Sequence, residues 1–212
     1  LLVFYFYPLG SILGLSFAPQ GRIDLATSAK LLGTAYYLRV IWFTLWQAAL
    51  STALTMAAAL PAAYVFAHYE FRGKAFLHAL TTVPFVLPTM VVALAFTALL
   101  GPSGALNTLL MRLLHLPQAP LRLQYTLGAI LLAHVFYNYT IVVRLVGTFW
   151  ANLHPHLEEA ARTLGASPWR AFGTVTLPQL GPALGAAALL VFTFCFTSFG
   201  VVLVLGGPRF AT

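Results

Sequence analysis

Long apolar runs, separated by short polar stretches, constrain this chain more than any other feature of its sequence. Of its 212 residues, 60% are hydrophobic and only 7% are charged, whereas about a quarter of the residues in a soluble domain are charged. The runs approach or exceed the ~20 residues that cross a bilayer as a helix. The sequence therefore predicts an all-α integral membrane protein, a helical bundle with five spans near residues 1–17, 39–67, 76–100, 123–150 and 183–205.

The chain begins inside one apolar run and ends just after another, so we expect it to be a fragment of a longer protein. We divide it into two regions. Residues 1–38 would hold a first transmembrane helix and an extracytoplasmic loop. Residues 39–212 would form a core transmembrane domain, incomplete at its C-terminus, with a polar loop over 151–182. Pro84 and Pro88 in the third run each remove a backbone donor, so that span should bend.

The charged residues argue for contact with lipid and against nucleic acid. The net charge is +7, and the basic residues are scattered singly or in pairs between apolar runs, a pattern that suits anionic lipid head groups. Their distribution does not fix the orientation: five lie on the side of the 151–182 loop and six on the other. The five are Arg72, Lys74, Arg144, Arg162 and Arg170; the six are Arg22, Lys30, Arg39, Arg112, Arg122 and Arg209.

Signatures of catalysis are missing. The sequence has no H-E-x-x-H, no G-x-S-x-G and no phosphate-binding G-x-x-x-x-G-K-[ST] motif. One cysteine, Cys195, excludes a disulfide or a cysteine-based metal site within the chain. We therefore expect no enzyme, no metal and no cofactor bound by this chain, and any ATP it depends on would be bound with magnesium by another polypeptide.

The polar loop at 151–182 reads as two short helices joined at a glycine. His154 and Pro155 suit a helix start, and Glu158 and Glu159 fall in its first turn, where negative charge complements the helix dipole. Gly165 suits the left-handed position that ends a helix. An apolar stripe should run along this helix, formed by Leu157, Ala160, Ala161 and Leu164.

A second helix should start at Ser167, as cap, and Pro168, and should end at Leu177-Pro178, because proline disfavours helical geometry in the residue before it. Its face would hold Trp169. Small side chains on the first helix would let a partner surface approach closely, as in docking of a helix into a groove. The alternative is a pair of amphipathic helices resting on the membrane interface with Trp169 as anchor, which composition and spacing alone favour.

The same residues resemble a known signature. Glu159-Ala160-Ala161, a glycine four residues after the second alanine and Leu177-Pro178 twelve beyond that glycine resemble the EAA loop of ABC importer permeases. The resemblance extends over about residues 40–212. Within it, several segments resemble the thiamine and ferric-iron permease branch, in its amino-terminal half: residues 44–54, 83–88, 131–138, 196–200 and 205–208.

This resemblance implies a fold and a function. The fold would be the six-helix bundle of type I ABC importers, in a bacterial inner membrane, with the 151–182 loop in the cytoplasm. The chain would be a transport subunit for a small solute, with thiamine or ferric iron favoured. Its partners would be a dimer of ATPase subunits, a second permease half and an extracytoplasmic solute-binding protein. The residues that couple it to the ATPase would be Glu159, Ala160, Ala161, Leu164, Gly165, Leu177 and Pro178.

Polar residues within the spans raise a second question. Gln47, Ser51, Thr52 and Thr55 follow helical spacings in the second span. For the translocation pathway the best candidates are His134, Asn138 and Ser198, and the alternative for each is a hydrogen bond that joins helices. Arg144 lies about two turns from the end of the fourth span, so we expect its side chain to snorkel to the interface.

Two other classes of protein remain open from the sequence. A channel or secondary transporter would use the loop only as an interfacial hairpin and would carry flux without an ATPase. A membrane-embedded enzyme would need a nucleophile–base pair or a metal constellation, which the sequence does not offer.

Overall fold

The computed structural model describes residues 2–18, 33–154 and 156–210, and the regular structure in these ranges is helical, with no strand. This confirms the all-α class. The chain divides into two compact units, Leu1–Phe43 and Thr44–Thr212, and the boundary falls inside helix α3 (Ala35–His68).

The first unit begins with an apolar helix. The π-helical turn η1 (Leu2–Phe6) runs into α1 (Tyr7–Phe17), and Pro8 lies in the first turn of α1, where its missing N–H breaks no helical bond. The apolar stretch Val3–Phe17 is shorter than the helices that can cross a membrane by length and composition. The polar loop predicted to follow lies largely outside the described residues, which resume at 33.

Four helical stretches in the described part of the chain are long and apolar enough to cross a membrane. They are Ala35–His68, Thr89–Leu114, Leu127–Ala151 and Pro168–Phe196. The second and fourth predicted spans correspond to the first and third of these. The third and fifth predicted spans have different bounds in the structure, for reasons that lie in their prolines and polar residues.

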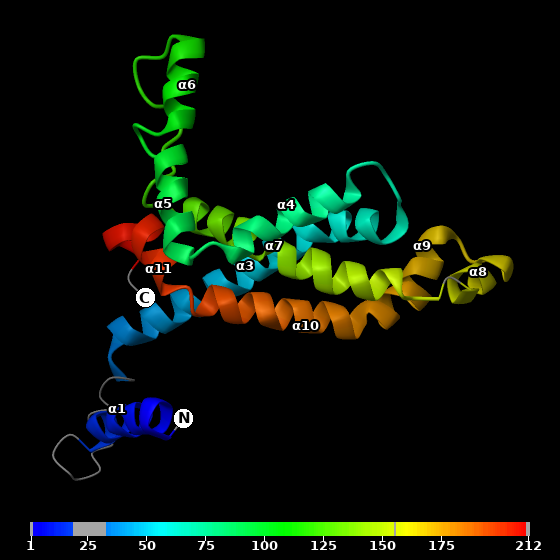
Figure 1. Cartoon of the computed structure of the whole chain (residues 1–212), viewed down its shortest axis with the longest axis horizontal. Helices are drawn as coiled ribbons and strands as arrows, with labels where there is room; N and C mark the ends of the chain where they lie inside the picture. The colour runs from blue at the N-terminus through cyan, green and yellow to red at the C-terminus, as the bar shows by residue number, and fades with distance from the viewer. Residues whose placement is uncertain (1, 19–32, 155, 211–212) are drawn as a thin grey trace. The chain divides into compact units, whose positions relative to one another are not determined.

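The core of the second unit is built on small side chains. Helices α3, α7 (Leu127–Ala151) and α10 (Leu177–Phe196) run side by side (Figure 1), and α7 and α10 are in close contact. A Cβ added at Gly147 of α7 would lie 3.4 Å from the carbonyl oxygen of Ala63 in α3. Small residues allow such close approach of backbones, which favours helix association in a bilayer. The buried cluster includes Ala48, Ala59, Ala63, Val142, Val143, Val146, Ala187 and Val191.

The third predicted span, 76–100, is two helices. Helix α4 (Lys74–Val86) ends before Pro88, and α5 (Thr89–Leu100) starts after it, followed by α6 (Ala105–Leu114). Figure 1 shows α5 and α6 rising away from α4 and α7. Leu87 is extended, at φ −72° and ψ 139°, the geometry that a following proline imposes. The predicted bend is therefore at Pro88, whereas Pro84 stays within α4.

The fifth span starts earlier and ends earlier than the predicted 183–205. Helix α9 (Pro168–Ala171) passes through a π-helical turn, η2 (Phe172–Thr176), directly into α10. The prediction that Leu177-Pro178 ends the loop helix is wrong: Leu177 is helical, at φ −61° and ψ −44°. The wide turn η2 and the place of Pro178 at the start of α10 let the helix tolerate the missing N–H.

At its other end, α10 breaks at Thr197 and Ser198, before the short helical pieces α11 (Phe199–Val201), η3 (Val202–Gly206) and η4 (Gly207–Arg209). The break leaves the carbonyl group of Cys195 without its regular helical partner, because the N–H of Phe199 bonds to Thr197 instead. Such a carbonyl must find another donor at membrane depth.

Candidate functional site

The polar loop predicted from sequence forms a defined elbow. Helix α8 (His156–Thr163) carries Glu158 and Glu159 in its first turn, as predicted, and Gly165 follows at φ +94°. The N–H of Ala166 bonds to the carbonyl of Ala161 and that of Gly165 to the carbonyl of Arg162, each at 3.0 Å. This pair of bonds is the Schellman motif, which closes a helix end through a left-handed residue. Pro155, the predicted first helical residue, lies outside the described residues.

The second arm of the elbow starts at the predicted cap. The Ser167 hydroxyl accepts a bond from the N–H of Arg170 at 3.4 Å, and Pro168 occupies the first turn of α9. Because α9 continues through η2 into α10, the second arm is the beginning of a membrane-spanning helix. A displacement of the elbow therefore acts directly on a span.

A partly buried hydrogen bond ties the two arms together. The hydroxyl of Thr176, which is buried, donates to a carboxylate oxygen of Glu158 at 2.5 Å. Below them, Trp150 at the end of α7 stacks on Phe172 with ring centroids 6.0 Å apart. Both glutamates lie in the first turn of α8, as predicted. The predicted coupling residue, Glu159, is exposed, and its carboxylate pairs only with His156 among the described residues. Glu158 is the residue that the prediction from sequence missed, because its partner is 18 positions away.

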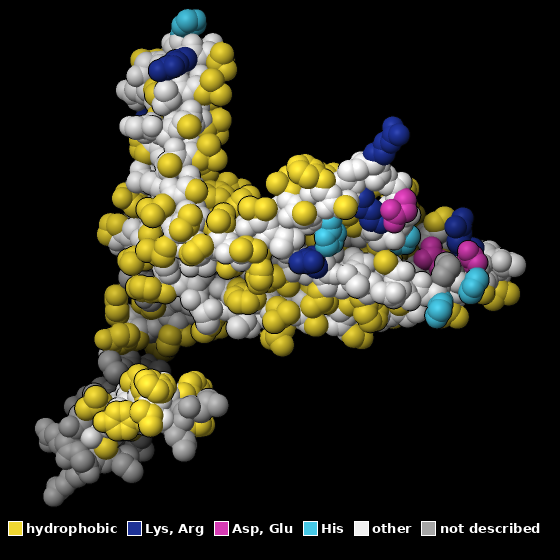
Figure 2. All heavy atoms as spheres, in the orientation of Figure 1, with side chains coloured by type: hydrophobic (Ala, Val, Ile, Leu, Met, Phe, Trp, Pro, Cys, Tyr) yellow, Lys and Arg dark blue, Asp and Glu magenta, His cyan; other side chains and the backbone are white. Residues whose placement is uncertain are grey.

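The predicted coupling residues lie mostly on the outer surface of the elbow. Six of them are exposed and Ala161 is half-buried; the six are Glu159, Ala160, Leu164, Gly165, Leu177 and Pro178. Leu164 is 89% exposed and Trp169 is 85% exposed. Large apolar side chains that stay this open on a well-defined hairpin are typical of a surface that contacts something else. Figure 2 shows acidic and histidine side chains at the same end of the bundle, where α8 and α9 lie.

A cavity of 1040 Å³ opens beneath the elbow, between it and the ends of α3 and α7. Its lining combines aromatic and charged side chains, including Tyr64, His68, Trp150, Glu158, Arg162 and Trp169. The cavity leaves the outer arm α8 supported mainly through Glu158 and the η2 turn.

The second group of candidates lies in the interior of the bundle. His134 of α7 is 2% exposed; its Nδ1 lies 2.9 Å from the hydroxyl of Ser51 and its Nε2 lies 2.5 Å from that of Ser198. The Ser198 hydroxyl donates its proton to the carbonyl of Cys195 at 3.0 Å. Ser198 must therefore accept from Nε2–H, and Ser51 donates to Nδ1. This chain of bonds joins α3, α7 and the break after α10.

Side-chain amides complete this cluster. Gln47 Nε2 donates to the buried carbonyl of Cys195 at 3.3 Å, and Asn138 Nδ2 donates to the carbonyl of His134 at 3.0 Å. The carbonyl freed by the break in α10 is thus satisfied from α3 and from Ser198. Sequence analysis found these polar residues but not their grouping. Their burial favours the role of joining helices, and the pathway role of His134, Asn138 and Ser198 stays a prediction.

Within the described residues, no group of three or more histidine, cysteine, aspartate or glutamate side chains is arranged to hold a metal ion. In the interior cluster, two buried side-chain oxygens, Gln47 Oε1 and Asn138 Oδ1, have no hydrogen-bond partner among the described residues.

A bundle of membrane-spanning helices, one of which begins in a rigid polar elbow, is the architecture of a membrane transport subunit. Residues 56–211 match the family described as binding-protein-dependent transport system inner membrane component. The chain belongs to this family of inner-membrane transport components, which are permeases and not enzymes.

Curated relatives agree with this assignment. The sulfate transport system permease protein CysT of Escherichia coli K12 is 37% identical over 145 residues, which cover 68% of this chain and 50% of the relative. The thiamine transport system permease protein ThiP of Brucella abortus is 32% identical over 206 residues, 96% of this chain and 37% of the relative. The chain spans about half or less of the length of these relatives.

Solved structures show the same fold. A bacterial ABC transporter involved in the import of the acidic polysaccharide alginate superposes with a TM-score of 0.72 at 19% identity, over 99% of this chain and 74% of that one. A second structure, of the alginate transporter with a pentasaccharide-bound periplasmic protein, gives a TM-score of 0.75, also at 19% identity, and covers 73% of that chain. The predicted fold class, a helical bundle of the ABC permease kind, is therefore confirmed.

Proposed function

We propose that this chain is the translocation subunit of an ATP-driven importer and that residues 156–178 receive the movement of an ATPase. The observation that carries the proposal is the continuous helix from Pro168 to Phe196. Its first turns belong to the elbow and the rest to the membrane, so a push on the elbow is a push on a span. The Schellman bonds at Gly165 and the Glu158–Thr176 bond make the elbow rigid enough to transmit it.

The open surface of the elbow supports docking onto a partner. Leu164 and Trp169 are largely exposed, and Ala160 presents only a methyl group. In this proposal Glu159 orients the docked helix by charge, Ala160 and Ala161 allow close approach, and Gly165 sets the angle between the arms. Leu177 and Pro178 mark where the elbow passes into the span.

The proposed assembly contains further subunits. A dimer of ATPase subunits would bind ATP and magnesium, a second permease half would complete the pathway, and a solute-binding protein would deliver cargo from outside. A periplasmic binding protein accompanies the alginate transporter that shares this fold, which supports the last of these. Opening to either side would follow from rigid-body movement of the helices.

Among solutes, the relatives support thiamine and sulfate. Sulfate was not considered in the sequence analysis, and the relatives lend no support to ferric iron. We therefore propose a small solute of the thiamine or sulfate kind, with the choice between them set by the chemistry of the pathway.

Substituting Gly165 tests the proposed coupling. At φ +94° a β-branched side chain is strained by about 1–2 kcal/mol or more, so Gly165→Val should distort the elbow and leave the membrane bundle folded. We expect ATP-driven uptake to fall at least about tenfold in the complete transporter, while the purified complex keeps its thermal stability. Gly185→Val is the matched control, because Gly185 lies in α10 outside residues 156–178, has no positive φ and has open space around it. Normal uptake by Gly165→Val, or flux without any ATPase, would contradict the proposal.

A further inference from the structure

Arg144 occupies an unusual place in the bundle. It lies in the membrane-spanning helix α7, about two turns before its end at Ala151, and its side chain is exposed. It lines two adjoining grooves, one of 1040 Å³ and one of 790 Å³. The first groove follows α4 from the Glu70 end toward Leu87, and the second lies between α7 and α10. Arg144 is the one residue that the two linings share.

The linings supply no free anion for this guanidinium. Glu70 is the only acid in the first groove, and its carboxylate already pairs with Lys74 at 2.5 Å. The second groove is lined by no acid at all. Among the residues that the structure describes, Arg144 makes neither an ion pair nor a hydrogen bond. An arginine in a spanning helix is costly and is usually paired or functional.

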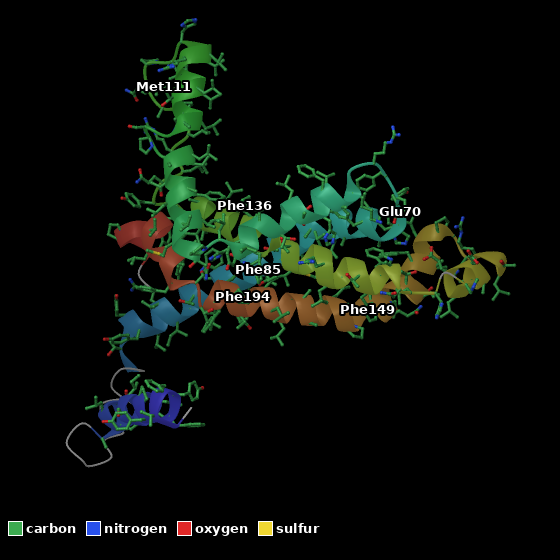
Figure 3. All side chains as sticks on the ribbon, viewed as in Figure 1. Glu70, Phe85, Met111, Phe136, Phe149 and Phe194 are labelled. Carbon is green, nitrogen blue, oxygen red and sulfur yellow. The ribbon has the colours of Figure 1, made fainter. Side chains whose placement is uncertain are left out.

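Polar side chains lie in the same grooves. His78 and Thr82 of α4 line the first, and Thr148 and Asn152 of α7 line the second. Figure 3 labels Glu70 at the outer end of this region and Phe85 near the middle of the bundle, where Phe85 meets Phe194 with ring centroids 5.9 Å apart. Both grooves that Arg144 lines therefore contain hydrogen-bonding side chains, and the second also contains the aromatic rings of Phe85 and Phe149.

We propose that Arg144 is a binding site for a small oxyanion that passes through these grooves. A guanidinium offers planar, paired N–H donors that match the oxygens of sulfate or phosphate. With Glu70 neutralised by Lys74, the surplus charge of the grooves is positive. An anion is therefore attracted here, whereas thiamine, with its permanently cationic thiazolium ring, is repelled. The sequence predicts that the Arg144 side chain snorkels to the membrane interface. In this proposal its guanidinium instead binds an anion in the grooves.

The inference rests on the proposed import function and narrows its cargo to the anionic class. It commits to a free, transported anion. The phosphate of a membrane lipid and a carboxylate of the second permease half are competing partners for the same guanidinium, and the test separates them.

The test uses the full-length permease, assembled with its ATPase and solute-binding protein in proteoliposomes. ATP-driven uptake of radiolabelled sulfate, molybdate, phosphate and thiamine is measured for the parent and for Arg144→Gln, Arg144→Lys and Arg112→Gln. At least one oxyanion should be imported by the parent. At oxyanion concentrations below saturation, Arg144→Gln should lower the rate of oxyanion uptake at least about tenfold, the loss expected when a charged hydrogen-bonding partner is removed. Arg144→Lys should restore part of it, and Arg112→Gln, which removes one charge on α6, should change nothing.

Several results would overturn the oxyanion site. One is import of thiamine but of no oxyanion, and another is oxyanion uptake by Arg144→Gln equal to that of the parent. A third is that Arg144→Gln loses a co-purifying phospholipid, or the second permease half, while its uptake kinetics stay intact. The proposed function is judged separately by co-purification of the ATPase and by ATP hydrolysis. If the complex assembles and hydrolyses ATP but Arg144→Gln takes up oxyanion as the parent does, only the anion site is contradicted and the proposed function stands.

Discussion

At the scale of single residues, the imidazole of His134 connects three segments of the bundle. Its two ring nitrogens meet the hydroxyls of Ser51 and Ser198, which lie 83 and 64 positions away in the sequence. The break in α10 is held by this histidine and by the bonds to the carbonyl of Cys195. Loss of such hydrogen bonds is costly at membrane depth, because no water replaces them.

Replacing His134 with alanine should therefore weaken the fold. The change removes both bonds, leaves the buried hydroxyl of Ser51 and the half-buried hydroxyl of Ser198 without that partner and opens a cavity, so we expect a loss of about 2–4 kcal/mol and a lower melting temperature of the purified protein. Thr193→Ala is the control, because the Thr193 hydroxyl is exposed and bonds only to the Leu189 carbonyl of its own helix. Equal melting temperatures for the two variants would contradict this role of His134.

Local signals in the sequence predicted local geometry well. Ser167 caps a helix and Gly165 is left-handed, because each choice depends only on neighbouring residues. Pairings across the sequence could not be predicted in this way: Glu158 meets Thr176, and His134 meets Ser198, through folding of distant segments. For the same reason the place of Arg144 between two grooves could not be read from its position in α7.

At the scale of helices, the prolines show how context decides between a bend and a continuation. Pro88 separates α4 from α5, whereas Pro84 remains inside α4 and Pro178 lies in the first turn of α10. The predicted stop at Leu177-Pro178 failed because the π-helical turn η2 precedes it. Because η2 leads into α10 without a gap, Pro178 lies within a continuous helix, and the wide turn of η2 accommodates its missing N–H. The loop helix and the last span therefore form one continuous element.

The contact between α3 and α7 depends on the small side chain at position 147. A Cβ there would lie 3.4 Å from the carbonyl oxygen of Ala63, which is ordinary contact, so Gly147→Ala should be tolerated. Gly147→Leu should force the helices apart and destabilise the bundle by about 1–3 kcal/mol, measured as thermal unfolding in detergent. Gly181→Leu is the control, since nothing lies within 4 Å of a Cβ at that position. Similar stability of the two leucine variants would show that the helices are not closely packed at Gly147.

At the scale of the whole molecule, the proposed coupling would make the elbow and the bundle parts of one lever. The second arm of the elbow is the start of a span, α10 packs against α7, and α7 carries both His134 and Arg144. Movement at the elbow would therefore reach the polar cluster and the grooves through helix contacts. Such a lever would operate in the inner membrane, because the chain belongs to a family of inner-membrane transport components.

Site-directed crosslinking from the elbow tests this account most directly. A cysteine at Ala160, in the assembled and actively importing complex, should form a crosslink to the ATPase whose yield changes between nucleotide-free and ATP-bound states. The native Cys195 is buried and should not compete, and a cysteine at Leu113, on the exposed surface of α6, should give no such product. Capture of the ATPase from position 160 alone is the predicted result. Active import without any crosslink from position 160 to an ATPase would contradict the account.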